Sequence, residues 1–338
     1  MTQKEDSSKQ SGTKRNKIEA LIRKLHSKNF RKKNQVIERL GKYKSTRAIN
    51  TLYEIVESSK WTDKQRINAI NALGKHNRKT NRFKQTLKKV VDEPSENREL
   101  RRAALTHLSK LRDPQLIGMF KRALNDDYRF IRFWAVRALI KMSNKKAETA
   151  LIQALGDKDE EIRKNVYMHL ERSGPEIIPY LKVAAKSPDA NKQLRYGIMG
   201  LLGRLGHEDA IPILIDALDA GNDRVVRIAI RGLGKVTSAK SIKPLLDLYA
   251  KENMYERFVQ SSLYKIAQAD ILAATIMFVS YILDEESDDN AIELIIQTLK
   301  NLRPESTIAI GELKTDPKLA EPVREKMDGL MERLENED

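Results

Sequence analysis

Apolar residues recur along the chain at nearly regular intervals. Nine leucines mark these intervals and are separated by 30 to 36 residues: Leu40, Leu73, Leu108, Leu139, Leu170, Leu202, Leu233, Leu263 and Leu299. A small or β-branched residue precedes each leucine by four positions, and from the third repeat onward an apolar residue precedes it by eight. Positions i, i+4 and i+8 share one face of an α-helix. Each leucine therefore marks a helix that buries one face.

A second amphipathic segment precedes each of these helices, as in residues 49–56, 116–124 and 211–218. Short polar turns join the two segments, and their Asp and Asn residues are expected to cap the helix that follows. These turns include Asp126-Asp127, Asp157-Lys158-Asp159, Ser187-Pro188-Asp189 and Gly221-Asn222-Asp223. A helix–turn–helix unit of about 31 residues cannot bury its apolar face alone, so neighbouring units must stack. The pattern predicts an all-α fold, a right-handed α-solenoid of about nine to ten repeats.

Two stretches carry a resemblance to a known family. One runs from Asp127 to Leu139, with Ile131-Arg132 and Ala138-Leu139, and the other is Leu-Arg-Tyr-Gly-Ile-Met-Gly-Leu-Leu-Gly at 194–203. They resemble HEAT repeats, in the short-period form shared with phycobilin-lyase-type repeats. The resemblance covers roughly residues 18–302, and a poorly matching helical pair follows to about residue 335. The family includes transport receptors, kinase and phosphatase scaffolds, chromosome-organising subunits and a few enzymes, so the resemblance implies the fold and leaves the function open.

Charge divides the chain into two parts. Residues 1–150 contain 38 Lys and Arg against 15 Asp and Glu, a net charge of +23, whereas the remaining residues have a net charge of −7. We expect a disordered basic and polar tail at 1–16, followed by a single solenoid at 17–335. Its part 17–150 is strongly basic, and its part 151–335 is mildly acidic. Such an asymmetry indicates an anionic partner for the basic part.

The composition also narrows the compartment and the chemistry. Cysteine is absent, which excludes disulfides and Cys-ligated metals and fits a reducing interior. No apolar signal-like segment begins the sequence, and the longest apolar stretch, residues 271–282, is too short to span a membrane. We therefore expect a cytoplasmic protein with no membrane span, no cofactor and no metal.

Three rows of residues recur at fixed distances from the leucines. Seven positions before the leucine stand basic residues: Lys33, Arg66, Arg101, Arg132, Arg163 and Arg195. The resemblance to HEAT repeats implies that this row bridges to turn aspartates of an adjacent repeat, for which Asp63, Asp127, Asp159 and Asp189 are available. Two positions after the leucine stand Lys42, Lys75, Lys110, Lys141, Arg172, Arg204, Lys235 and Lys265. Cations in the last turn oppose the helix dipole, and together they form a continuous basic edge.

The third row occupies the positions six and two before the leucine, off the apolar stripe. It includes Arg102, Phe133 with Arg137, Lys164, Tyr196, Arg227 with Arg231, and Arg257. In HEAT repeats the second helices usually line the inner surface, so the resemblance implies that this row faces a groove. Cations interleaved with aromatic rings suit a phosphate backbone or an acidic peptide. An ordinary solvated polar face explains the row equally well.

Two basic runs strengthen the case for an anionic partner, at residues 14–47 and 75–89. We predict a non-enzymatic scaffold that binds an anionic macromolecule, with DNA or RNA as the first candidate and an acidic protein as the alternative. Electrostatic contact with phosphates would make binding steeply dependent on salt. The predicted binding residues are Lys32, Lys33, Lys42, Arg66, Lys75, Arg101, Arg102, Lys110, Arg132, Phe133, Arg137, Lys141, Lys164 and Tyr196.

Catalytic motifs are largely missing, and we expect no catalytic residue. The chain has no Gly-rich phosphate loop, Gly-x-Ser-x-Gly elbow or His-Glu-x-x-His motif. A single His207-Glu208 pair falls short of the several such pairs in HEAT-type di-iron hydroxylases. A second alternative is an alkylpurine DNA glycosylase built from HEAT-like repeats, because Asp126-Asp127, Tyr128, Phe133 and Trp134 provide the residue types of that site.

Overall fold

The chain folds into helix pairs that follow the predicted repeats. The computed structural model describes residues 2–27, 32–75, 80–284, 286–317 and 321–335, with the backbone alone at 2–13, 253 and 322. Within these ranges it has twenty α-helices, short 3-10 turns and no strand. The prediction of an all-α fold is confirmed.

Odd-numbered helices are the first members of the pairs. They are α1 (Thr2–His26), α3 (Thr46–Glu57), α5 (Asn81–Asp92), α7 (Ile117–Ala123), α9 (Lys145–Ile152), α11 (Ile178–Ala185), α13 (Ile211–Asp216), α15 (Ile242–Lys251), α17 (Ile271–Leu283) and α19 (Glu305–Lys314). Even-numbered helices are the second members. They are α2 (Lys33–Leu40), α4 (Asp63–Leu73), α6 (Arg98–Leu108), α8 (Arg129–Met142), α10 (Glu160–Arg172), α12 (Lys192–Leu205), α14 (Asp223–Val236), α16 (Glu256–Ala269), α18 (Asp289–Lys300) and α20 (Glu321–Glu335). All nine marker leucines lie in even-numbered helices and are fully buried.

Two compact units divide the chain, at Met1–Leu151 and Ile152–Asp338. The boundary coincides with the change in charge, so the first unit carries the excess of basic residues and the second the excess of acidic ones. Helix α1 overlaps residues 1–16, which we predict to be a tail, and its buried positions begin at Ile18.

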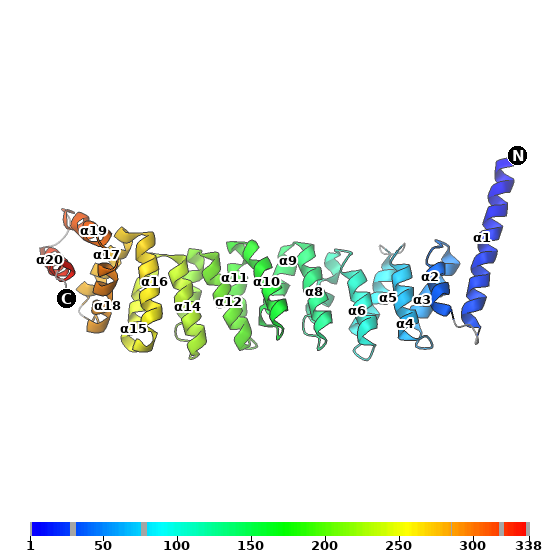
Figure 1. Ribbon diagram of the computed structural model, residues 1–338, viewed down its shortest axis with the longest axis horizontal. Coiled ribbons are helices and arrows are strands. Elements are labelled where there is room, and N and C mark those ends of the chain that lie inside the picture. Colours follow the sequence, from blue (N-terminus) through cyan, green and yellow to red (C-terminus); the bar gives the residue numbers. More distant parts are fainter. Residues whose placement is uncertain (1, 28–31, 76–79, 285, 318–320, 336–338) are drawn as a thin grey trace. The chain divides into compact units, whose positions relative to one another are not determined.

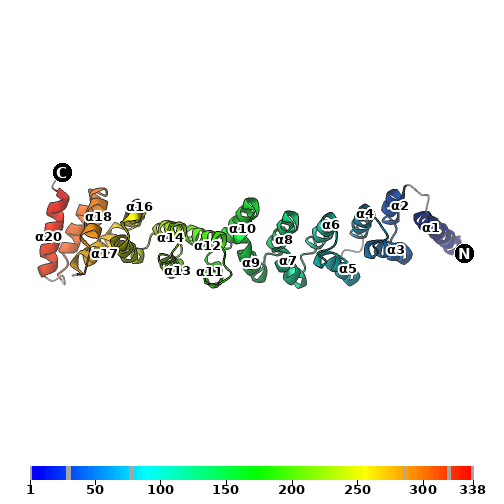
Figure 2. The same cartoon turned by 90° about the horizontal axis from the view of Figure 1, so that it is seen from below.

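In the first unit the helices form two layers. Figure 1 shows the helices of this unit following one another in chain order. Figure 2 shows α2, α4, α6 and α8 in one layer, the even layer, and α3, α5, α7 and α9 in the other, the odd layer. Helix α4 packs against both α2 and α6, and α6 packs against α8. The apolar stripes of both layers meet in the core, where Leu73, Ile70 and Phe83 are fully buried.

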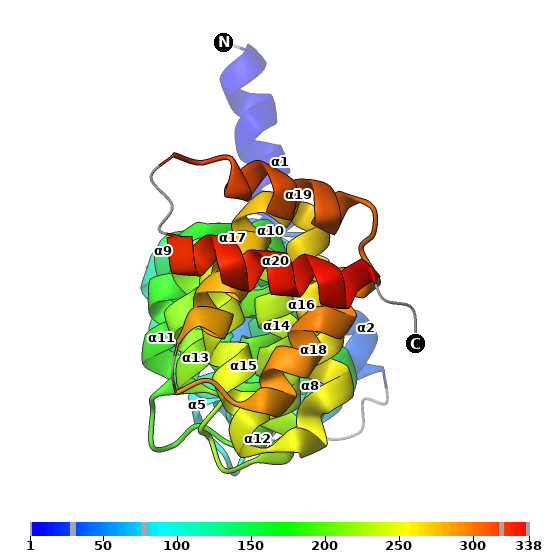
Figure 3. The ribbon, with the colours of Figure 1, turned by 90° about the vertical axis from the view of Figure 1, so that its left-hand side faces the viewer.

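The second unit repeats this arrangement with α10, α12, α14, α16 and α18 as its even layer. The backbones of α12 and α14 lie close together at Gly203 and Gly232, where a Cβ atom added to Gly203 would lie 2.5 Å from the Gly232 Cα. At its carboxyl end α20 crosses α17 and α18 and packs on both (Figure 3). No helix in the described ranges is long and apolar enough to cross a membrane.

Polar side chains begin many of the even-numbered helices, as the turns predict. Asp159 caps α10 and Asn222 caps α14, each through a side-chain oxygen that accepts a backbone N–H. The cap of α12 is Asn191 in place of Asp189. Helix α8 differs because Tyr128 holds its N-cap position without a side-chain hydrogen bond. Asp126 instead accepts the Tyr128 N–H at 2.9 Å and so orders the turn before α8.

Candidate functional site

Arginines of the first basic row lie inside the first unit and hold its repeats together. Arg66 donates from Nε to the Val56 carbonyl at 2.9 Å and from Nη1 and Nη2 to Glu96 at 2.7 and 2.6 Å. Arg101 donates to the Val91 carbonyl at 3.0 and 3.1 Å and to Asp126 at 2.5 Å. Each guanidinium therefore links the first helix of its own repeat to the turn of the next repeat.

These contacts confirm the structural interpretation of the row, but with different acids. Arg66 and Arg101 pair with Glu96 and Asp126 of the next repeat, which are not among the turn aspartates named from the sequence. Of those aspartates, Asp63 lies 4.0 Å from Arg66 on the same helix. Arg132 donates to the backbone carbonyls of Asp126 and Asp127 at 3.0 and 3.1 Å. The exposed fractions are 6% for Arg66, 9% for Arg101 and 4% for Arg132. Because burial leaves these three guanidiniums no access to a macromolecule, they are not part of the surface described below.

The two lysines at the start of α2 differ in exposure. Lys33 is half-buried, and its Nζ lies 5.4 Å from the centroid of the Trp61 ring in the turn of the next repeat. Lys32 is exposed at the N-cap position of α2. Lys33 thus repeats the bridging position of Arg66 and Arg101 with a cation–π contact, and Lys32 stays available to solvent.

A basic edge runs along the even layer of the first unit. Its members, which we call the lysine edge, are Lys42, Lys75, Lys110 and Lys141, and all four are exposed. They stand at or just beyond the carboxyl ends of α2, α4, α6 and α8, which succeed one another in one layer. None of the four forms an ion pair with an acid in the described part of the chain. Their charges remain free to attract an anionic partner.

Helix α8 exposes a row of aromatic residues. Phe130, Phe133, Trp134 and Arg137 follow the spacing i, i+3, i+4, i+7, which places them on one side of the helix. We call these four residues the α8 face. The buried stripe of α8 lies elsewhere, at Ile131, Ala135 and Leu139 among others. Phe130 is 44% exposed, which is unusual for a phenylalanine, and the Phe133 and Trp134 rings are half-buried.

Stacking contacts order the α8 face. The Phe133 and Trp134 rings meet edge to face with centroids 6.0 Å apart. The Arg137 guanidinium carbon lies 5.7 Å from the Phe133 centroid and 5.1 Å from the Trp134 centroid. Arg137 is itself exposed, so its guanidinium covers the two rings and still presents its N–H groups to solvent.

A neighbouring cluster extends this surface to the start of α6. The Tyr128 ring packs against Phe130 at 5.5 Å, and Arg98 lies 5.5 Å from the Tyr128 centroid. Glu99 accepts hydrogen bonds from the Tyr128 hydroxyl at 2.8 Å and from Arg102 at 2.7 Å. These two hydrogen bonds lower the pKa of the Glu99 carboxyl, the one from Tyr128 having the larger effect. The acid of this cluster is therefore already paired, and Arg98 and Arg137 keep the surface cationic.

Two predicted residues belong to the second unit and so lie outside the α8 face. Lys164 is exposed on α10. Tyr196 is half-buried on α12, where its hydroxyl lies 3.3 Å from the Asn222 Oδ1 and the Arg224 guanidinium carbon lies 4.5 Å from its ring centroid.

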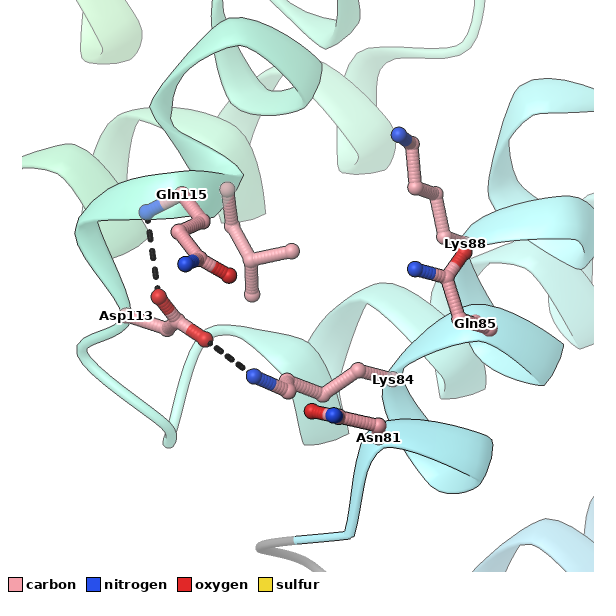
Figure 4. Close-up of a pocket in the computed structure, with 7 residues that line it drawn as sticks. Asn81, Lys84, Gln85, Lys88, Asp113 and Gln115 are labelled. Atoms are coloured by element: carbon pink, nitrogen blue, oxygen red, sulfur yellow. Dashed lines mark hydrogen bonds and ion pairs between the residues drawn. The ribbon is translucent and has the colours of Figure 1, made fainter.

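The odd layer of the first unit contains a small polar cavity of about 270 Å³ (Figure 4). It is lined by Asn81, Lys84, Gln85, Lys88, Asp113, Gln115 and Leu116. Lys84 Nζ donates to Asp113 at 2.8 Å, and the Gln115 N–H donates to the same carboxylate at 3.0 Å. The cavity thus lies at a junction between α5 and the following repeat, and the ion pair in its lining joins the two.

Two residues weighed for catalysis or metal binding, Asp126 and His207, take part in local structure. Asp126, one of the two aspartates of the glycosylase alternative, is occupied by Arg101 and by the Tyr128 N–H. The His207 Nδ1 accepts the Asp209 N–H at 3.3 Å and caps a 3-10 turn. Across the described residues no three His, Asp or Glu side chains gather closely enough to hold a metal ion.

Comparison with known proteins identifies the repeats. The family model of HEAT repeats matches residues 59–140, 93–171, 119–190 and 178–263, which together span 59–263. The chain belongs to the HEAT-repeat family. No curated protein matches its sequence.

Solved structures of HEAT-repeat solenoids share the fold at low sequence identity. Kap121p bound to Nup53p superposes with a TM-score of 0.53 and 13% identity, over 95% of this chain and 41% of Kap121p. Kap121p bound to the extreme C-terminus of the phosphatase Cdc14p gives 0.53 and 12%, over 95% and 42%. Importin beta gives 0.45 and 13%, over 94% of this chain and 53% of importin beta. This HEAT-repeat chain therefore spans about half the length of importin beta and less of Kap121p.

Two residues of this HEAT-repeat surface, Phe130 and Arg98, escaped the sequence reasoning. Phe130 stands nine positions before the marker leucine Leu139, and Arg98 stands ten positions before Leu108. Neither position belongs to the three rows read from the sequence. Adding positions separated by three or four residues from Phe133 and Arg137 would have shown the full aromatic face.

Proposed function

We propose that this HEAT-repeat chain is a non-enzymatic scaffold that binds an acidic segment of another protein. The α8 face supplies the apolar anchors, and the lysine edge with Arg98 supplies the surrounding positive charge. The observation that supports this most strongly is the exposed Phe130 beside the Phe133–Trp134–Arg137 stack. Tryptophan, tyrosine and arginine are the residues most enriched at the energetic centres of protein interfaces.

Charge defines the partner's chemistry. The first 150 residues carry a net charge of +23, and the lysine edge has no acid paired with it in the described ranges. Complementary charge accelerates association and selects partners, while buried aromatic contacts provide most of the affinity. The preferred partner is therefore a segment that combines Asp and Glu with a few large apolar side chains. Kap121p, which has the same fold, holds protein partners in its structures with Nup53p and Cdc14p.

The test uses the full chain and a labelled acidic amphipathic peptide. This peptide has Leu and Phe at i, i+3, i+4 and i+7 and Glu at its other positions, and a matched peptide has Gln in place of Glu. We expect Phe130→Ala and Arg137→Ala each to weaken binding of the Glu peptide about tenfold, because truncating an interface anchor costs more than ~1 kcal/mol. Fluorescence anisotropy measures the affinities, and circular dichroism checks the fold.

Two control variants test whether a loss of binding is specific to the α8 face or follows from removing any exposed charge or apolar side chain. Arg122→Ala removes one exposed arginine from α7 in the odd layer, and Val183→Ala removes an exposed apolar side chain from α11. Both are expected to leave the affinity unchanged. Equal losses in Arg137→Ala and Arg122→Ala would show that net charge alone attracts the peptide and would contradict the proposal.

Nucleic acid is a second candidate partner, and the lysine edge is the observation that favours it. Exposed lysines with no acid partner in the described ranges suit phosphate contacts, which are independent of sequence and strongly dependent on salt. The α8 face favours a protein partner because its aromatic rings are already covered by one another and by Arg137, with Phe130 alone largely open. Base stacking requires an accessible ring face, and the Phe133 and Trp134 rings are half-buried and lie beneath Arg137.

A further inference from the structure

A row of cations runs along α14 in the second unit. Arg224, Arg227, Arg231 and Lys235 follow the spacing i, i+3, i+7, i+11, which keeps them on one side of the helix. Val225, Ala229 and Leu233 form the opposite, buried side. We call these four cations the α14 row. They lie in a unit whose net charge is −7, so a general need for basic surface does not explain them.

Aromatic rings hold the guanidiniums of the α14 row in place. The Arg224 guanidinium carbon lies 4.5 Å from the Tyr196 centroid on α12. On the other side, Arg227 and Arg231 lie 5.5 and 4.9 Å from the Phe258 centroid on α16. A guanidinium stacked on a ring keeps its N–H groups in a fixed plane and loses less freedom when it binds a carboxylate.

Two of these guanidiniums lack an acidic partner. Within the described parts of the chain, neither Arg224 nor Arg231 forms an ion pair, and both are exposed. Arg227 differs because it binds both carboxylate oxygens of Asp223, one turn earlier. Its Nε donates to Asp223 Oδ1 at 2.9 Å, and its Nη2 makes a short contact with Oδ2. This pair is exposed on both sides, and exposed pairs contribute only ~0–1 kcal/mol. A carboxylate from a partner can therefore replace Asp223.

The row ends at a shallow, wide-open cavity between the carboxyl ends of α14 and α16. Lys235 and Lys265 line this cavity of about 440 Å³, together with Thr237 and Gln268 among others. Both lysines are exposed and unpaired in the described ranges. The cationic track thus continues from the arginines into a hollow with two further positive charges.

Spacing defines the form of the ligand. Eleven residues of helix separate Arg224 from Lys235, a rise of about 16 Å. An extended peptide covers this length with about five residues, and its alternate side chains recur every ~6.6 Å. Arg227, Arg231 and Lys235 are four residues apart, or about 6 Å along the axis. Carboxylates at alternate positions of an extended strand therefore meet successive cations of the row.

We propose that the α14 row is a second docking site, which binds an extended segment of a partner protein with Asp or Glu at alternate positions. Arg231 and Arg224 bind its carboxylates, Arg227 joins them when it is released from Asp223, and Lys235 and Lys265 bind the last acid at the cavity. This site is independent of the proposed function of the α8 face, since its residues belong to the other unit.

The test uses the full chain and a labelled peptide of alternating Asp and Ser, which lacks the apolar anchors that the α8 face requires. Arg231→Gln is expected to weaken binding about tenfold, because it removes a guanidinium pre-oriented for a carboxylate. Asp223→Asn is expected to tighten binding about threefold, because it frees Arg227. Misfolding cannot produce this gain.

Matched variants make the outcome decisive. Arg172→Gln removes an exposed arginine of α10 that forms no ion pair with the residues the structure describes, and Asp216→Asn breaks the exposed pair of Asp216 with Lys186. Both are expected to leave the affinity within about twofold. The site would be refuted if Arg231→Gln behaved like Arg172→Gln, or if Asp223→Asn failed to tighten binding. Tighter binding of single-stranded RNA than of the peptide, lost in Arg231→Gln, would also refute it in favour of a phosphate-backbone site.

Discussion

At the scale of single residues, the same side-chain type has two opposite roles in this chain. Arg101 is buried, binds a carbonyl and a carboxylate, and joins two repeats. Arg137 and Arg231 are exposed, stack on aromatic rings and have no acid partner among the described residues. Position within the repeat decides the role, because the seventh position before the marker leucine faces the neighbouring turn and the second faces solvent.

This difference predicts a large effect on stability for the buried arginine. Arg101→Met leaves the Asp126 carboxylate, 12% exposed, without its cation, and breaking such a buried pair costs ~3–5 kcal/mol. Urea unfolding measures the loss. Arg122→Met is the matched control, since its pair with Asp92 is exposed and is worth less than ~1 kcal/mol. Equal effects of the two substitutions would contradict the bridging role.

The sequence predicted the buried rows more accurately than their partners. The nine leucines located nine of the ten even-numbered helices of the described residues, all but α20, because burial of a stripe demands a strict period. The turn acids were predicted less well than the arginines, because Arg66 and Arg101 pair with Glu96 and Asp126 of the next repeat, whereas Asp63 lies 4.0 Å from Arg66 within α4. Exposed positions are not held to such a period. The sequence therefore did not show that Phe130 shares one side of α8 with Phe133, Trp134 and Arg137.

At the scale of elements, close contact between α12 and α14 orients the α14 row. Gly203 and Gly232 allow the two helix backbones to meet, and this places Tyr196 on α12 against Arg224 on α14. In the first unit the turn before α8 orients the α8 face in a similar way. Asp126 accepts the Tyr128 N–H in this turn, and the Tyr128 ring packs against Phe130.

The contact predicts opposite signs for two glycine substitutions. Gly203→Ala places a methyl group 2.5 Å from the Gly232 backbone, so the helices must separate, and overpacking of this kind costs ~1–3 kcal/mol. Gly311→Ala in α19 meets no atom within 4 Å and gains up to ~1 kcal/mol from helix propensity. Thermal unfolding distinguishes the two. A stabilising Gly203→Ala would show that the helices are not in close contact.

At the scale of the whole molecule, the net charge changes sign at the boundary between the two units. The basic unit contains the lysine edge and the α8 face, and the acidic unit contains the α14 row. The chain would then hold acidic protein segments at two separate places. Two weak sites on one scaffold can act together when one partner reaches both, and the gain depends on the partner's linker.

Salt and the α8 face together decide between a protein and a nucleic acid partner. Phosphate binding through lysines releases counterions, so the affinity for RNA falls steeply between about 50 and 200 mM salt. Binding through aromatic anchors depends less on salt, because apolar contacts supply most of the free energy. The two partner classes therefore respond differently to Phe130→Ala.

The most direct measurement titrates the full chain and its Phe130→Ala variant with the acidic amphipathic peptide and with single-stranded RNA of equal charge, each at the two salt concentrations. The account predicts that at about 200 mM salt the peptide binds more tightly than RNA and loses about tenfold in affinity with Phe130→Ala. Two results together would contradict the account: RNA binds more tightly than the peptide at the higher salt, and Phe130→Ala leaves the affinity for the peptide unchanged.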